Sequence, residues 1–145
     1  MRLQLALNVP DIDAAVDYYG KLFGTEPSKR RDGYANFAIA EPPLKLVLFE
    51  NPDASGHLHH IGVEVLGADV VDTVQTRLEQ VDLLDEARSE AKCCHAKQEK
   101  LWTRPHNNLR WEWYYVSDEF TSADEDSLGK TCCTGPTKTE KIGTI

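Results

Sequence analysis

The sequence has no long apolar run and few basic residues, and both absences narrow its range of functions. A transmembrane helix needs about eighteen consecutive apolar residues. No stretch of the sequence is that long, so we expect no membrane span. Lys and Arg number 16 against 24 Asp and Glu, and the net charge of -8 disfavours nucleic acids and anionic membrane surfaces as partners. The first residues are too polar for a signal peptide. We therefore expect a cytoplasmic protein that binds a small molecule or another protein.

The chain has only four cysteines, and they form two adjacent pairs, Cys93–Cys94 and Cys132–Cys133. Adjacent cysteines do not match the spaced framework of a disulfide-rich secreted domain, and a disulfide between neighbours needs strained geometry. In a reducing cytosol, such a pair is either a thiol ligand pair or a chance occurrence in a tolerant loop. The composition leaves both explanations open.

The chain contains an internal repeat, which becomes visible after a shift of 56 residues. QLALNV at 4–9 then lies over HIGVEV at 60–65. Both are alternating strands, and each precedes an amphipathic helix, at 11–24 and at roughly 68–80. Three further strands are expected in each half. In the first half they lie at about 26–30, 34–40 and 44–50. In the second half they lie in a polar stretch ending at the cysteines, at 99–103 and at 109–116.

This order predicts an α+β fold in which paired βαβββ modules form a cupped mixed sheet. We expect a single domain over 1–116, with modules at about 1–52 and 57–116. From 117 to 145 the sequence is rich in polar residues and poor in large apolar ones, so we expect a mobile C-terminal tail.

Three polar residues share a feature that suggests a site. Gln4, His60 and Glu112 each lie on the strand face opposite the apolar row of their strand. Gln4 and His60 are also related by the repeat, so a pseudo-twofold axis would bring them to similar places. Taken singly, each has a simpler explanation: a surface amide, a hydrogen-bonded strand histidine or a solvated carboxylate. Their agreement favours a metal site with one amide oxygen, one imidazole and one carboxylate.

Two further positions limit this site. His59 shares the face of Ile61, so we expect it to point toward the helices and not into the cup. Val47 occupies the place in the first half that Glu112 occupies in the second, because PLKLVL lies over NLRWEW. An apolar side chain cannot bind a metal, so we expect no fourth ligand there.

Several phrases of the sequence resemble a known superfamily. The opening LALNVPDIDAAVDYYGKLFG and the doubled module resemble the vicinal oxygen chelate superfamily of glyoxalases, extradiol dioxygenases and fosfomycin and bleomycin resistance proteins. GYANFAIAEPPLKLVLFENP, HIGVEV, the adjacent cysteines and QEKLW are similar to the carbon–arsenic lyases that cleave organoarsenicals, and to related cadmium-induced proteins. The resemblance covers about residues 2–116.

The resemblance implies a nonheme Fe(II) site at Gln4, His60 and Glu112, where other divalent metals could replace iron in a purified sample. Such an enzyme uses dioxygen as co-substrate to cleave trivalent organoarsenicals, methylarsenite or trivalent aromatic arsenicals, to arsenite, which detoxifies them. Members of the superfamily often form dimers, so the resemblance is compatible with a homodimer, but the sequence does not determine the oligomeric state.

The resemblance assigns the first cysteine pair to substrate binding. Two thiolates at Cys93 and Cys94 would fill the two exchangeable positions of a monosubstituted trivalent arsenical and tether it beside the iron. Cys132 and Cys133 are either an accessory arsenic-binding pair or have no function.

Other functions explain less of the sequence. A glyoxalase would need the fourth ligand that Val47 replaces, and extradiol cleavage or bleomycin binding leaves the adjacent thiols unexplained. The strongest alternative is a non-catalytic protein of the same fold that sequesters arsenic or cadmium through its thiols.

Overall fold

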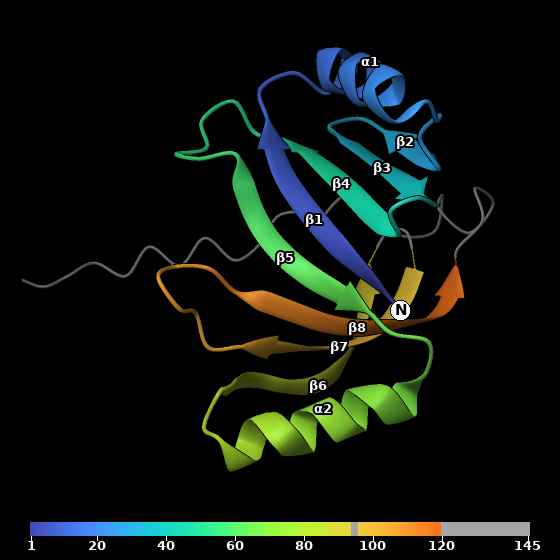
Figure 1. The fold of residues 1–145 in the computed structure, drawn as a ribbon. Helices are drawn as coiled ribbons and strands as arrows, with labels where there is room; N and C mark the ends of the chain where they lie inside the picture. Colours follow the sequence, from blue (N-terminus) through green and yellow to red (C-terminus); the bar gives the residue numbers. More distant parts are fainter. Residues whose placement is uncertain (94–95, 120–145) are drawn as a thin grey trace, which may run out of the picture.

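The computed structural model of the protein describes residues 1–93 and 96–119. In this part of the chain the elements follow the predicted order, a βαβββ unit that occurs twice (Figure 1). Their bounds are β1 (Arg2–Val9), α1 (Ile12–Phe23), β2 (Lys29–Arg31), β3 (Tyr34–Ile39), β4 (Leu44–Glu50), β5 (Leu58–Glu64), α2 (Ala68–Gln80), β6 (Leu84–Cys93), β7 (Ala96–Thr103) and β8 (Trp111–Glu119).

All the strands of the described residues belong to one mixed sheet with the order β2-β3-β4-β1-β5-β8-β7-β6. In each unit the first and last strands pair in parallel, β1 with β4 and β5 with β8. The two units join through the antiparallel pair of β1 and β5. The first strands of both units therefore lie side by side at the centre of the sheet, and the sheet curves around them (Figure 1).

Each helix covers one end of this sheet from the outside. α1 packs on β3 and β4, and α2 packs on β6, β7 and β8 (Figure 1). Local residue preferences begin and end α1: the Asp11 side chain accepts a hydrogen bond from the Ala14 backbone N–H at 2.9 Å, and Gly24 ends the helix with a φ of 61°. No helix among the described residues is long and apolar enough to cross a membrane.

Two separate hydrophobic cores lie beneath the helices, one for each unit. The first is built around Phe37 and Leu48, both fully buried, and the second around Val71 and Leu101, also fully buried. Because the apolar rows of the strands face these cores, the polar rows of β1, β5 and β8 are directed to the opposite, inner face of the sheet.

The last strand differs from its predicted extent. It begins at Trp111 and continues to Glu119, so Ser117, Asp118 and Glu119 are part of the sheet, with Ala96 opposite Glu119. The remainder of the predicted tail, 120–145, lies outside the described residues.

Candidate metal centre

The structure brings Gln4, His60 and Glu112 together on the inner face of the sheet. They come from β1, β5 and β8, which are neighbouring strands, and their exposed fractions are only 7%, 8% and 4%. The Gln4 Nε2 atom lies 3.0 Å from His60 Nε2 and donates to Glu112 Oε2 at 3.2 Å. His60 Nε2 lies 3.4 Å from Glu112 Oε2. Three residues that are far apart in the sequence thus form one buried polar cluster.

Glu112 is kept ionised inside this cluster. Burial alone would raise the pKa of its carboxyl group, but the hydrogen bond with His60 and the positive charge of Lys100 outweigh burial and lower the pKa below its usual value. The Lys100 Nζ atom lies 3.1 Å from Glu112 Oε1, while the other carboxylate oxygen faces Gln4 and His60. One oxygen of Glu112 is therefore available to a cation on the side of the imidazole.

The orientation of His60 is fixed by its neighbour in the sequence. His59 Nδ1 lies 2.7 Å from His60 Nδ1, so the imidazole of His60 uses this nitrogen within the protein and directs Nε2 toward Gln4 and Glu112. Trp102 contacts the same imidazole edge to face, at 5.2 Å between ring centroids. A hydrogen-bonded second nitrogen is the usual way in which a protein orients a metal-binding histidine.

The expected direction of the His59 side chain is wrong. His59 is exposed, and its ring lies 5.0 Å from the ring of Phe49 and beside His60, on the inner side of the sheet. The register between β1 and β5 shifts between Ala6 and Leu7, which breaks the strict alternation near the start of β5. Sequence periodicity gave no signal for this irregularity.

The three side chains fit a small divalent metal ion in their chemistry and spacing. Neighbouring ligands of an octahedral ion with bonds of about 2.1 Å lie about 3 Å apart, close to the 3.0 to 3.4 Å observed here. The Gln4 amide presents Nε2 to the cluster in the observed orientation. With its oxygen turned to the same place, the set of an imidazole nitrogen, a carboxylate and an amide oxygen suits a first-row transition metal. The described part of the chain contains no group of three His, Cys, Asp or Glu side chains that could hold a metal ion, so a metal site at this cluster would need Gln4 as a ligand.

Gly62 provides the space that Gln4 needs. A Cβ atom at Gly62 would lie 3.2 Å from both Cβ and Nε2 of Gln4 and 3.4 Å from Cε1 of Tyr114. We expect Gly62→Ala to displace the amide and weaken Co(II) binding by about tenfold or more, in a protein that still folds. Titration with Co(II), followed by its visible absorption, measures the affinity.

Gly56→Ala is the matched control, because no atom lies within 4 Å of a Cβ atom at that position. Equal affinity of the two alanine variants for Co(II) would contradict the assignment of Gln4 as a ligand.

The backbone of Cys93 lies far along the sheet from this cluster. Cys93 is the last residue of β6 and pairs with Ala96, whose partner on β8 is Glu119. Glu119 is seven residues beyond Glu112 on the same strand, or about 23 Å at about 3.3 Å per residue. Cys94, Cys132 and Cys133 lie outside the described residues. The role of the Cys93–Cys94 pair in binding the substrate therefore stays a prediction.

Two lysines of β7 have carboxylate partners. Lys97 Nζ lies 3.1 Å from Glu90 Oε1, and Lys100 is paired with Glu112. The β6–β7 hairpin thus carries Cys93 at one end and, through Lys100, a direct contact to the cluster further along β7.

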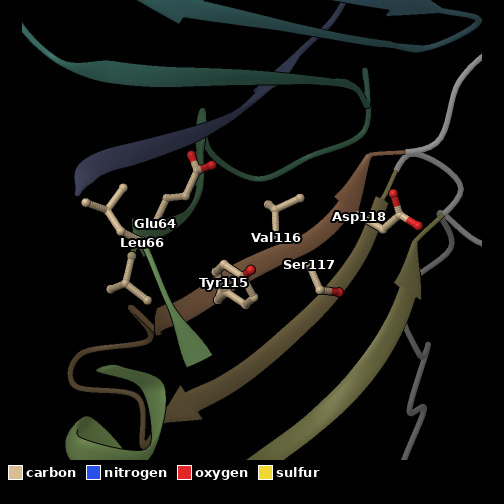
Figure 2. A pocket seen from close by; sticks show the side chains of 7 residues that line it. Glu64, Leu66, Tyr115, Val116, Ser117 and Asp118 are labelled. Carbon is tan, nitrogen blue, oxygen red and sulfur yellow. The ribbon is translucent and has the colours of Figure 1, made fainter. Parts of the chain in front are cut away.

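A shallow pocket opens near the cluster but is not lined by its three side chains. Its lining residues are Glu64, Val65, Leu66, Tyr115, Val116, Ser117 and Asp118 (Figure 2). A second shallow pocket also includes Glu64, together with residues from the start of β1 and the β3–β4 turn. Glu64 therefore lies between the solvent and the interior polar residues.

The fold and the sequence both have known counterparts. Residues 3–84 match the sequence model of the Glyoxalase/Bleomycin resistance protein/Dioxygenase superfamily. The crystal structure of a member of this superfamily from Vibrio splendidus superposes with a TM-score of 0.55 at 16% identity, covering 79% of this chain and 97% of that one.

Two relatives are much more similar in sequence. Cadmium-induced protein CadI of Mycobacterium tuberculosis is 46% identical over 142 residues, covering 92% of this chain and 93% of its own length. A trivalent organoarsenical cleaving enzyme of Thermomonospora curvata is 45% identical over 138 residues, covering 92% of this chain and 88% of its own.

Proposed function

The chain belongs to the Glyoxalase/Bleomycin resistance protein/Dioxygenase superfamily, and we propose that it cleaves the carbon–arsenic bond of trivalent organoarsenicals, releasing arsenite. In this proposal Gln4, His60 and Glu112 hold Fe(II), and dioxygen is the co-substrate. The observation that carries it is the convergence of these three side chains, with polar side-chain atoms 3.0 to 3.4 Å apart. The similarity to an organoarsenical cleaving enzyme supports the choice of substrate.

Three protein ligands leave room at a metal ion for other molecules. Bound Fe(II) would supply the redox chemistry that activates dioxygen, as it does with other sets of three facial ligands. Glu112, whose pKa is lowered, supplies the negative charge, and His60 offers Nε2. Val47, which is buried on β4 beside Ala6 of β1, offers no ligand at the place related to Glu112. A four-ligand glyoxalase centre is therefore disfavoured.

Cleavage of methylarsenite with dioxygen is balanced in atoms and electrons. Methylarsenite and one dioxygen molecule contain the same atoms as arsenite and formaldehyde. The carbon–arsenic bond breaks, carbon is oxidised, dioxygen accepts its electrons, and arsenic remains trivalent. The reaction therefore needs no reductant other than the substrate.

Cys93 and Cys94 are proposed to capture the arsenical. A monosubstituted trivalent arsenical has two exchangeable ligands, and two neighbouring thiolates replace both while the carbon substituent stays bound. Trp102 of β7 pairs with Glu112, and Cys93 lies at the opposite end of the β6–β7 hairpin from Trp102. Capture by the thiols and cleavage at the metal centre are therefore separate steps in this proposal.

Sequestration of arsenic or cadmium without turnover is the second candidate function. It is favoured by the similarity to a cadmium-induced protein and by the distance between Cys93 and the polar cluster along the sheet. The two functions differ in stoichiometry, because an enzyme releases many arsenite molecules per chain and a sequestering protein stops when its thiols are occupied.

Incubation of the Fe(II)-loaded protein with a large excess of methylarsenite in air separates them. We expect arsenite, measured by chromatography with arsenic-specific detection, to exceed the protein concentration many times. Uptake that ends at about one bound arsenical per thiol pair, without arsenite, would replace the lyase by the sequestration function.

A further inference from the structure

Behind Gln4, on the side away from the imidazole, the amide meets a buried tyrosine. The Tyr114 hydroxyl group donates to Gln4 Oε1 at 2.7 Å and lies 3.3 Å from Glu64 Oε2. Tyr114 is 1% exposed, and burial, with the charges of Glu64 and Glu112, raises its pKa, so the phenol keeps its proton. A hydroxyl group has one hydrogen to donate. It therefore serves either Gln4 or Glu64, and not both at once.

The observed orientation of the Gln4 amide is not the one that binds a cation. Its NH₂ group faces the cluster and donates to Glu112 Oε2, and an amide nitrogen with two hydrogens has no lone pair to offer a metal ion. A half turn about the Cγ–Cδ bond exchanges the oxygen and the nitrogen. The oxygen then faces His60 and Glu112, and the NH₂ group faces Tyr114.

After this half turn, the hydrogen bonds remain satisfied only if Tyr114 changes its role. The tyrosine oxygen accepts from the Gln4 NH₂ group, and its hydrogen must then go to another acceptor. Glu64 is in place for this purpose, since Arg2 Nε donates to its Oε2 atom at 2.7 Å and Lys45 Nζ lies 3.9 Å away. Burial would raise the pKa of Glu64, but the bond from Arg2 and the charge of Lys45 outweigh it and lower the pKa, so the acceptor is a carboxylate.

We propose that Glu64 is a positioning residue for the metal centre: by accepting the Tyr114 hydrogen, it allows the Gln4 amide to turn so that the oxygen faces His60 and Glu112 when a cation binds. In the observed state the tyrosine donates to Gln4 Oε1 and holds the amide in the orientation that excludes a cation, and removal of Glu64 would take away the acceptor that lets the amide turn. This inference rests on the proposed metal centre. It adds to that centre two residues on the far side of Gln4, one of which reaches the solvent-facing pocket of Figure 2.

The test uses the full-length protein and Co(II), whose visible absorption reports binding without turnover. We expect Glu64→Val to weaken Co(II) binding by about 10- to 100-fold, the range for residues that orient metal ligands. Glu64→Gln keeps a weaker, neutral acceptor and should lose about fivefold. Tyr115→Phe is the matched control, because Tyr115 packs with the core beneath α2, and it should bind Co(II) as the wild type does.

The decisive variant combines two substitutions. Adding Tyr114→Phe to Glu64→Val removes the hydroxyl group that holds the amide in the wrong orientation, so part of the lost affinity should return. If Glu64 acted only through protein stability or through its negative charge, the double variant would not recover affinity for Co(II). If Glu64→Val does not fold, as judged by its thermal transition, Glu64→Gln with and without Tyr114→Phe provides the same comparison.

The outcomes are distinguishable. Recovery in the double variant supports the inference. Wild-type affinity in Glu64→Val, or a double variant as weak as Glu64→Val, overturns it while the metal centre stands. A wild-type protein that binds no Co(II) overturns the metal centre and this inference together.

Discussion

His60→Ala is expected to abolish turnover while the protein still captures arsenicals. The substitution removes the Nε2 atom that lies within 3.4 Å of both Gln4 Nε2 and Glu112 Oε2, and with it one of the three proposed ligands. We expect arsenite release to fall about 1,000-fold or more, which corresponds to about 4 kcal/mol of activation free energy. Iron content, arsenite release and bound methylarsenite are measured on the same preparation, so that loss of the metal is separated from loss of the arsenical.

A second histidine provides the control for this variant. His106 is exposed in the loop between β7 and β8, where its backbone pairs with Leu109, and His106→Ala should retain iron and activity. Because His60 is buried, its removal also affects stability, and Glu112→Gln tests the same site with nearly unchanged shape. Undiminished arsenite release by both His60→Ala and Glu112→Gln would exclude the proposed metal centre.

Replacement of Cys93 and Cys94 by serine should remove the capture of arsenicals. A hydroxyl group is a poor ligand for soft trivalent arsenic, whereas a thiolate is a good one. At substrate concentrations well below saturation, we expect arsenite release to fall by about 100-fold or more, or about 2.7 kcal/mol. Iron binding should remain, because Gln4, His60 and Glu112 are unchanged. The rate as a function of methylarsenite concentration, together with equilibrium dialysis of the arsenical, measures both effects.

The chain contains its own control for this experiment. Cys132 and Cys133 form a second adjacent pair, and their replacement by serine should leave the rate at saturating substrate unchanged. If the Cys93/Cys94 variant binds methylarsenite as the wild type does, and only the Cys132/Cys133 variant loses it, the assignment of the capture site is reversed.

The repeat and the strand faces predicted the fold and the convergence of the polar cluster. Strand alternation determined on which side Gln4, His60 and Glu112 lie, and the pseudo-symmetry placed β1 beside β5. Both arguments rely on regular geometry, and the three side chains are in regular parts of their strands. The helix caps at Asp11 and Gly24 are local signals, and they were equally predictable.

The contacts around the cluster were not predictable from the sequence. The His59 side chain lies on the inner side of the sheet because the register between β1 and β5 shifts beside it. The two-residue alternation of a strand cannot predict such a shift. The hydrogen bond from Tyr114 to Gln4 joins residues 110 positions apart and depends on the space left by Gly62. The separation of Cys93 from Glu112 follows from the length of the β6–β7 hairpin, which the polar sequence of that region did not define.

Iron- and dioxygen-dependent cleavage is tested by arsenite release from methylarsenite by the Fe(II)-loaded protein, compared in air and under strict exclusion of dioxygen. Arsenic speciation in both reactions, and in a metal-free sample, identifies the products. We expect arsenite and formaldehyde in equal amounts only when iron and dioxygen are both present. Arsenite formed at the same rate without dioxygen, or none formed while methylarsenite stays bound to the protein, would contradict the proposed iron- and dioxygen-dependent cleavage.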